Sequence, residues 1–142
     1  MTQSDPKLSP AILALCHRVD AVGSRVTCRP APIDTDEDYL VFIKGERYDV
    51  LMDVLDGEGW ELGGSLGLAQ EGNSPFVSYR LGELNLIVTD DGEFHKKFLV
   101  ATALAKRLNV LDKEDRKALF QAVLYGNEHN VHSLEIPIYD PI

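Results

Sequence analysis

The chain has 142 residues, of which 44% are apolar, and a net charge of −9 from 14 basic and 23 acidic residues. This length and apolar content predict a single domain with one buried core, and the acidic balance opposes nonspecific binding to nucleic acid. No stretch has the length of a membrane span and the N-terminal residues lack the apolar core of a signal peptide, so we expect a soluble, cytoplasmic protein with no membrane partner.

The first half of the chain predicts alternating helical and extended elements. Ser9 is a typical helix N-cap, Pro10 fits the first helical position, and an apolar stripe continues the helical spacing to Asp20. A buried strand is indicated by the apolar run that follows Asp38. The expected elements are a helix from Ser9 to Asp20, a turn at Gly23-Ser24, a strand from Tyr39 to Lys44 and a helix from about Glu46 to Asp56.

The second half predicts three strands and then two helices. The strands are separated by turns rich in glycine and polar residues, and both helices begin at aspartates that can cap them. The expected elements are strands over Trp60–Ser65, Phe76–Arg80 and Glu83–Thr89, a helix opened by Asp90-Asp91-Gly92, and a helix from Asp112 to Gly126. The pattern predicts an α+β fold in which helices flank a mixed sheet, with one domain over residues 1–126 and a tail over 127–142 that packs on it or is partly irregular.

Two short polar motifs carry the functional signal. Val22-Gly23-Ser24-Arg25 is followed by Asp36-Glu37-Asp38 at the start of the apolar strand. Side chains alternate along a strand, so Asp36 and Asp38 project from the same face. Paired carboxylates are hard ligands that suit Mg²⁺ or Mn²⁺, and a glycine-serine turn lets the backbone and a hydroxyl approach phosphate groups. Together the motifs indicate a metal-nucleotide site.

The acidic cluster leaves a choice of register and a simpler interpretation. Asp34 alternates with Asp36 as well, but the apolar run begins directly after Asp38, so we prefer the pair Asp36 and Asp38 and place Asp34 in the loop. The simpler interpretation is a solvated acidic turn between two elements. The glycine-serine turn and the strand that follows the acids favour the site.

Charge is distributed unevenly along the chain. Residues 34–61 contain ten acidic side chains, whereas residues 96–117 contain seven basic side chains and three acids. The basic segment would supply a wall facing an acidic metal site. The acidic segment would suit a basic protein partner.

From Ser9 to Ile43 the order and spacing of these motifs resemble the polymerase-beta-like nucleotidyltransferase superfamily, whose members carry a helix, a Gly-Ser turn, a loop and an Asp-x-Asp strand in that order. Residues 94–126 are more loosely similar to small uncharacterised members encoded by tailed bacteriophages, which would place the protein in a host cytoplasm. The resemblance implies a nucleotidyltransferase fold, metal binding by Asp36 and Asp38, and nucleotide binding by Gly23, Ser24 and Arg25.

The chain departs from the superfamily pattern at two places. The loop after Ser24 has no further glycine, and the third carboxylate that the resemblance implies on a neighbouring strand aligns with Asn85. An asparagine can bind a metal through its carbonyl oxygen but cannot accept the proton of an attacking hydroxyl. Glu83, two residues away on the same expected face, is the alternative for that role.

Two functions follow, from different classes. The first is a transferase that uses Mg²⁺ or Mn²⁺ to move a nucleoside monophosphate from a nucleoside triphosphate to a hydroxyl of RNA, protein or a small molecule. In it Asp36, Asp38 and either Glu83 or Asn85 would be catalytic. The second is a catalytically degenerate fold that binds a nucleotide or a basic host protein without turnover. In either case a homo-oligomer or a partner chain would be able to complete the site.

The remaining candidates are expected to be structural. Cys16 and Cys28 are too few for a disulfide framework, with Cys16 on the apolar side of the first helix and Cys28 in a loop. The four histidines, His17, His95, His129 and His132, lack a third ligand and do not predict zinc. Arg80, Lys96 and Lys97 are cations that would be able to reach phosphates but fit solvated faces equally well.

Overall fold

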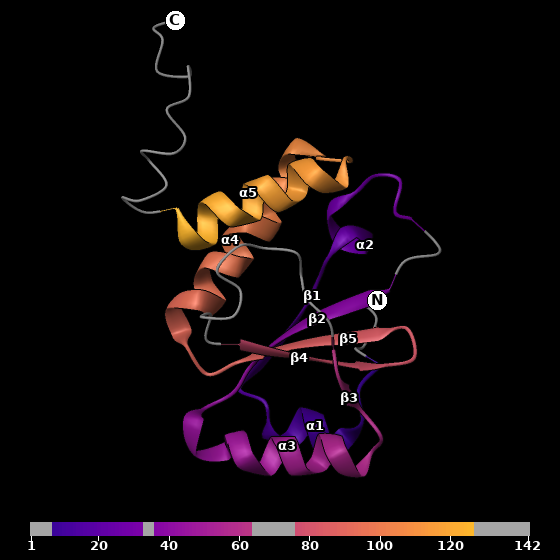
Figure 1. The fold of residues 1–142 in the computed structure, drawn as a ribbon, viewed down its shortest axis with the longest axis vertical. Helices are drawn as coiled ribbons and strands as arrows, with labels where there is room; N and C mark the ends of the chain where they lie inside the picture. Colours follow the sequence, from indigo (N-terminus) through magenta and orange to yellow (C-terminus); the bar gives the residue numbers. More distant parts are fainter. Residues whose placement is uncertain (1–6, 33–35, 64–75, 127–142) are drawn as a thin grey trace, which may run out of the picture.

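The computed structural model describes residues 7–32, 36–63 and 76–126 (Figure 1). In chain order its elements are α1 (Pro10–Leu15), β1 (Arg18–Val22), α2 (Ser24–Thr27), β2 (Glu37–Phe42), the 3₁₀ turn η1 (Gly45–Arg47), α3 (Tyr48–Gly57), β3 (Glu61–Leu62), β4 (Phe76–Leu81), β5 (Leu84–Thr89), α4 (Gly92–Leu108) and α5 (Lys113–Tyr125). The five strands form one mixed sheet flanked by helices, which confirms the predicted α+β class. None of the described helices is long and apolar enough to cross a membrane.

The sheet has the strand order β1-β2-β5-β4-β3. Its central pair, β2 with β5, is parallel, and the other three pairs are antiparallel. In the parallel pair Asp38 lies opposite Asn85, and on the other side of β5 Arg80 of β4 lies opposite the same asparagine. Paired residues project from the same face of a sheet, so this register places all three side chains together.

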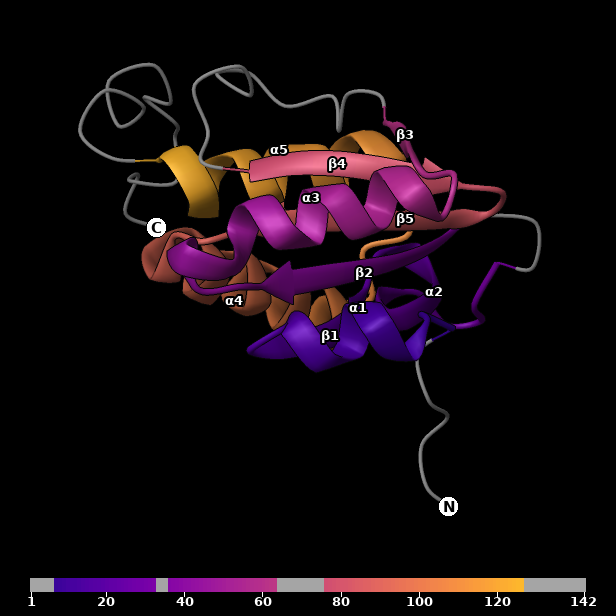
Figure 2. The same ribbon diagram turned by 90° about the horizontal axis from the view of Figure 1, so that it is seen from below.

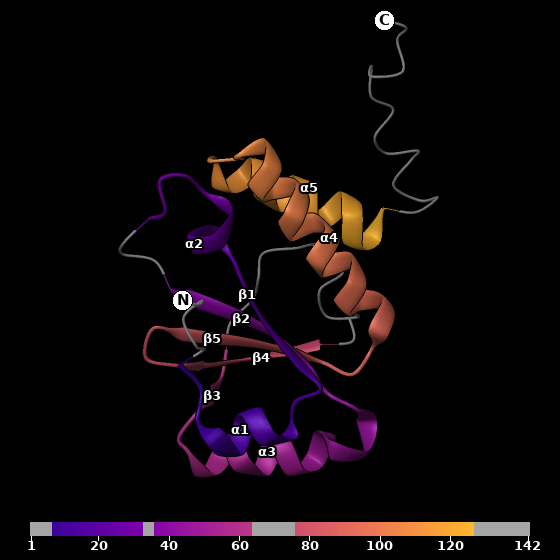
Figure 3. The same ribbon diagram turned by 180° about the vertical axis from the view of Figure 1, so that it is seen from behind.

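Each face of the sheet has its own apolar core. On one face α1 and α3 pack over alternate residues of β2 and β5, with Ile12, Leu51 and Leu55 fully buried. On the other face α4 and α5 cover Leu40 and Ile87. Figure 2 shows α1 and α3 in front of the sheet and α4 and α5 behind it, and Figure 3 shows α2 on the same side as α4. The polar edge of this second face, beyond Leu40, is where the aspartates lie.

The first helix is shorter than predicted, and this prediction was wrong. Helix α1 ends at Leu15, Cys16 caps it in an extended conformation, and the chain enters β1 at Arg18. Val19, which the helical stripe included, pairs with Val41 in the ladder between β1 and β2. Gly23-Ser24 therefore follows a strand and begins the short helix α2. Pairing with a buried strand outweighs the local helical spacing.

The later elements follow the predictions more closely. Asp91 caps α4 by accepting hydrogen bonds from the backbone N–H groups of Glu93 and Phe94, and Asp112 caps α5. The predicted 46–56 helix begins with the turn η1 and becomes α-helical at Tyr48. Of the predicted strand from Trp60 to Ser65, only Glu61–Leu62 is a strand in the described part, and Ser65 lies outside the described residues.

His95 of α4 is a buried polar residue in the second core. Its ring stacks on Phe42, with ring centroids 5.0 Å apart, and its Nε2 lies 3.5 Å from Oδ2 of Asp20. Asp20 is also bound by Arg18 of the same strand. Burial lowers the pKa of His95, and the contact with Asp20 opposes that shift.

Because the folded-state pKa of His95 lies below its unfolded value of about 6.5, protonation favours the unfolded chain. The stabilising contribution is present above pH 6.5 and is lost as the pH falls through the folded-state pKa. We expect urea unfolding to show a decrease in stability between pH 7 and pH 5 that is smaller in His95→Gln. Equal pH slopes for the two proteins would contradict this assignment.

Candidate functional site

Asp36, Asp38 and Asn85 converge at the end of the sheet where β2 begins. The Nδ2 of Asn85 donates hydrogen bonds to Oδ1 of Asp38 at 2.8 Å and to Oδ2 of Asp36 at 3.2 Å. The two carboxylates therefore lie on the same side of β2, as alternation predicts, and both are half-buried. The structure brings together the acid pair and the asparagine that the sequence singled out.

Arg80 completes this cluster from the neighbouring strand. Its guanidinium lies 2.9 Å from Oδ2 of Asp36, while 46% of the Arg80 side chain stays exposed. Burial raises the pKa of Asp38, the hydrogen bond from Asn85 lowers it, and the nearby Asp36 carboxylate raises it. Arg80 and Arg25 add smaller lowering effects. One carboxylate thus has a cation beside it, and the other is held mainly by an uncharged amide.

Gly23 lies directly against Asp38. Its φ of +86° and ψ of −176° belong to a region that residues with a Cβ rarely adopt. A Cβ at this position would stand 2.1 Å from Oδ2 and 2.8 Å from Cγ of Asp38. Both the backbone conformation and the contact require glycine, and the requirement explains why the polar motif has glycine before Ser24.

Helix α2 fixes the position of this glycine relative to the rest of the fold. The carbonyl of Gly23 accepts hydrogen bonds from Val26 and Thr27, which begins the helix. At its other end Cys28 is buried and its Sγ accepts a hydrogen bond from Arg116 of α5 at 3.2 Å. As predicted, Cys28 lies outside any regular element, directly after α2, where it caps that helix and ties it to α5.

Ser24 and Arg25 occupy different surroundings. Within the described residues the Ser24 hydroxyl makes no hydrogen bond, and the residue is half-buried. Arg25 pairs with Glu37 at 3.3 Å, and Lys7 approaches the same carboxylate at 3.4 Å. Arg25 is therefore engaged by Glu37 in this structure, while the hydroxyl of Ser24 is available to a ligand.

Glu83 lies in the turn before β5, whereas Asn85 lies on the strand. Glu83 follows Gly82 and is exposed. Its carbonyl accepts a hydrogen bond from the backbone N–H of Glu37 at 2.8 Å, but its carboxylate contacts neither aspartate among the described residues. Asp34, the alternative partner in the acid pair, lies outside the described residues.

The cluster around Asp36 and Asp38 has few ligands for a divalent cation. No group of three or more His, Cys, Asp or Glu side chains in the described ranges is arranged to hold a metal ion. Asp36 and Asp38 both accept a hydrogen bond from the same nitrogen of Asn85, so their carboxylates lie close together. A 180° flip of the Asn85 amide would direct its carbonyl oxygen toward them as a third hard donor. The described residues therefore offer two carboxylates and one amide oxygen as hard donors, which is too little negative charge for two divalent cations.

Sequence reasoning missed the pairing of Arg80 with Asp36. The sequence offers Arg80 only as a cation for phosphates and predicts that the basic segment over residues 96–117 faces the acids. In the described part of the chain, no ion pair links that segment to Asp36 or Asp38, and Arg116 instead binds Cys28 and the carbonyls of Val110 and Leu111. The signal that predicts the pairing is the hairpin itself: Arg80 and Asn85 flank a tight turn, so they lie opposite each other on neighbouring strands.

Comparisons with known proteins give one structural likeness. No protein-family model and no curated protein matches the chain. Among solved structures, the chain is similar to the crystal structure of conserved protein GrpB from Enterococcus faecalis, with 19% sequence identity and a TM-score of 0.46. The match covers 80% of this chain and 84% of that one.

The contact between Gly23 and Asp38 makes a testable prediction. Gly23→Ala should lower the free energy of unfolding by about 2–4 kcal/mol, because it combines backbone strain with a steric clash. In an Asp38→Ala background the loss should fall by about 1 kcal/mol or more, since the clashing carboxylate is gone. Urea unfolding of the four proteins measures the coupling.

Gly57→Ala is the matched control. A Cβ there would meet nothing within 4 Å, and the residue lies in α3. We expect it to be neutral or slightly stabilising. Equal losses for Gly23→Ala in both backgrounds would show that the contact with Asp38 is not the cause.

Proposed function

We propose that this chain is a metal-dependent nucleotidyltransferase that moves a nucleoside monophosphate from a nucleoside triphosphate to a hydroxyl acceptor. The observation that supports it is the convergence of Asp36 and Asp38 beside the backbone of Gly23. Two carboxylates next to a glycine backbone and an unbonded serine hydroxyl offer ligands for both a cation and phosphate oxygens. The resemblance of the motifs to the polymerase-beta-like superfamily agrees with this function.

Each residue of the cluster has a role in this proposal. Asp36 and Asp38 would hold Mg²⁺ or Mn²⁺, which when bound neutralises charge on the triphosphate and polarises the α-phosphoryl group. Gly23 would let the phosphates approach the backbone, and Ser24 would donate its hydroxyl hydrogen bond to a phosphate oxygen. Arg80, with nearly half of its side chain exposed, would turn from Asp36 to the triphosphate.

Proton transfer is the weakest part of the catalytic arrangement. The acceptor hydroxyl must lose a proton as it attacks the α-phosphorus and pyrophosphate leaves. Asn85 stands beside the acid pair and cannot take that proton. Glu83 is the nearby acid in the adjoining turn, where its exposed carboxylate would act as the base only by turning toward the cluster.

A second candidate function is nucleotide or protein binding without turnover. The specific observation that favours it is the closed network in which the Asn85 amide and the Arg80 guanidinium already satisfy Asp36 and Asp38. Such a network gives both carboxylates hydrogen-bond donors without a metal ion, although only Asp36 has a cation beside it. The protein would then act through bound nucleotide or through its acidic face toward a basic partner, and a second copy of the chain would be able to complete the surface.

Metal binding is tested by thermal unfolding with Mg²⁺ or Mn²⁺ and a non-hydrolysable nucleoside triphosphate. A ligand at 100 times its Kd adds about 2.7 kcal/mol to the free energy of unfolding, so the melting temperature should rise. Asp36→Ala and Asp38→Ala should each abolish that rise. Asp53→Ala, an exposed acid on α3, is the control that should retain it. A rise that survives in both site variants would exclude the acid pair as the metal site.

Turnover is tested separately, through the third position of the site. Asn85→Asp adds a carboxylate beside Asp38 and should raise metal-dependent pyrophosphate release about 10-fold or more, because a positioned base contributes 10²–10⁴-fold in many enzymes. Asn85→Ser, which adds no charge, should not. If Glu83 already serves as the base, Glu83→Gln should abolish release in the natural protein. No effect of any of these changes, with RNA, protein and small-molecule acceptors present, would favour binding without turnover.

A further inference from the structure

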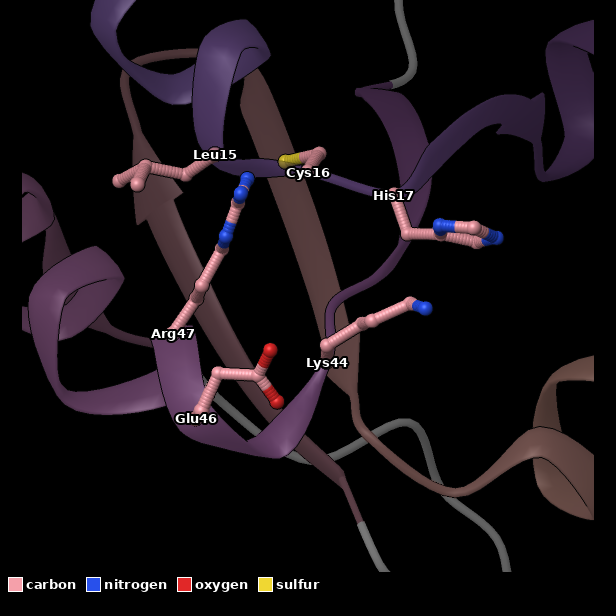
Figure 4. Close-up of a pocket in the computed structure, with 6 residues that line it drawn as sticks. All are labelled: Leu15, Cys16, His17, Lys44, Glu46 and Arg47. Atoms are coloured by element: carbon pink, nitrogen blue, oxygen red, sulfur yellow. The ribbon is translucent and has the colours of Figure 1, made fainter.

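A pocket lies at the opposite end of β2 from the aspartates. It is formed where the segment from α1 to β1 meets the segment from β2 to α3, and its volume is about 370 Å³. Its lining residues are Leu15, Cys16, His17, Lys44, Glu46 and Arg47 (Figure 4). Ligand pockets in proteins typically have volumes of about 300–1,000 Å³, so this one is large enough for a small organic molecule.

Backbone hydrogen bonds hold the basic residues of this pocket in place. The N–H of His17 donates to the carbonyl of Phe42 at 2.9 Å, which extends the pairing of β1 with β2 and sets His17 beside the end of β2. The N–H of Arg47 donates to the carbonyl of Lys44 at 2.8 Å and closes the turn η1. These two contacts bring an imidazole, an ammonium and a guanidinium to one pocket from two distant segments.

The two permanent cations of the pocket have no partner within the described residues. Neither Lys44 nor Arg47 forms an ion pair or a side-chain hydrogen bond there, although Glu46 lies between them in the chain. In Figure 4 the Arg47 side chain extends across the pocket toward Leu15 and Cys16, and Lys44 extends beside His17. The lining thus carries two cations and one acid, Glu46, and has an excess of positive charge in a chain whose net charge is −9.

We propose that this pocket binds a small phosphate monoester. Arg47 would bind two phosphate oxygens with its planar guanidinium, Lys44 would neutralise the second negative charge, and the imidazole of His17 would donate a further hydrogen bond. The volume exceeds the need of an inorganic ion and leaves room for an organic part. Glu46 would accept a hydrogen bond from a hydroxyl on that part, so a sugar phosphate is the expected class of ligand.

This site is independent of the proposed nucleotidyl transfer. Strand β2 has six residues, and at a rise of about 3.3 Å per residue its first and last Cα atoms are about 17 Å apart. The pocket also contains no activated nucleophile, because burial raises the pKa of the Cys16 thiol to about 11 and keeps it protonated at neutral pH. The pocket therefore binds its ligand without reacting with it.

The test uses ¹⁵N-labelled full chain, titrated at constant ionic strength with inorganic phosphate, ribose 5-phosphate, ribose and sulfate. We expect saturable shifts of the amides of Cys16, His17, Gly45 and Arg47, with ribose 5-phosphate binding more tightly than inorganic phosphate. Arg47→Gln and Lys44→Gln should each weaken binding about 10-fold or more. Lys113→Gln, an exposed lysine at the start of α5, should leave it unchanged.

Several results would overturn the proposal. They are an absence of saturable shifts, an equal response to sulfate and ribose 5-phosphate, equal affinity in Arg47→Gln, and shifts confined to Gly23, Ser24 and Asn85. The last result would show phosphate binding at the aspartate site instead. Because Lys44 and Arg47 are exposed and unpaired within the described residues, their replacement should leave the remaining amide spectrum unchanged, which checks folding in the same experiment.

Discussion

The parallel pairing of β2 with β5 is the contact on which the rest of the fold depends. Both strands are central, so both of their faces are covered, and residues of each alternate between the core under α1 and α3 and the core under α4 and α5. Parallel strands of this kind require a long connection, which here includes α3, β3 and β4. The register of β2 against β5 therefore sets which residues enter each core, and it also places Asp38 opposite Asn85. A shift of one strand by one residue would move its apolar side chains from one core to the other and separate Asp38 from Asn85.

The cluster around Asp38 shows how the fold accommodates acids at the margin of a core. Burial disfavours the ionised form of Asp38, and the compensation comes from groups on two other strands: the amide of Asn85 and the guanidinium of Arg80 beside Asp36. In the proposed function, a cation at Asp36 and Asp38 would have to replace these contacts. Its binding free energy would then be the difference between two sets of ligands for the carboxylates, and it would displace Arg80 from Asp36.

Local signals predicted much of this structure, and non-local contacts account for what they missed. Asp91 and Asp112 act as caps as their sequence context indicated, and the alternation of Asp36 and Asp38 gives the observed shared face. The segment after Leu15 also fits a helical stripe, and only its pairing with β2 makes it a strand. Arg80 reaches Asp36 because β4 turns back beside β5, a relation that spacing in the chain does not encode. The position of Glu83 in the turn rather than on the strand depends on Gly82, whose φ of +63° ends the hairpin one residue later than the apolar pattern indicated.

The outer strands of the sheet have a consequence for how the protein behaves at high concentration. Within the described residues the sheet ends at β1 on one side and at β3 on the other. Exposed strand edges are templates for pairing with other chains, and short strands and inward-facing charges are common defences against it. Here β3 has two residues, and β1 directs Asp20 inward toward His95 while Arg18 clamps it with hydrogen bonds of 2.8 and 3.1 Å. A strand of another chain that paired with the edge of β1 would place its side chains beside Arg18 and Asp20. This ion pair therefore disfavours edge-to-edge pairing of the sheet with other chains.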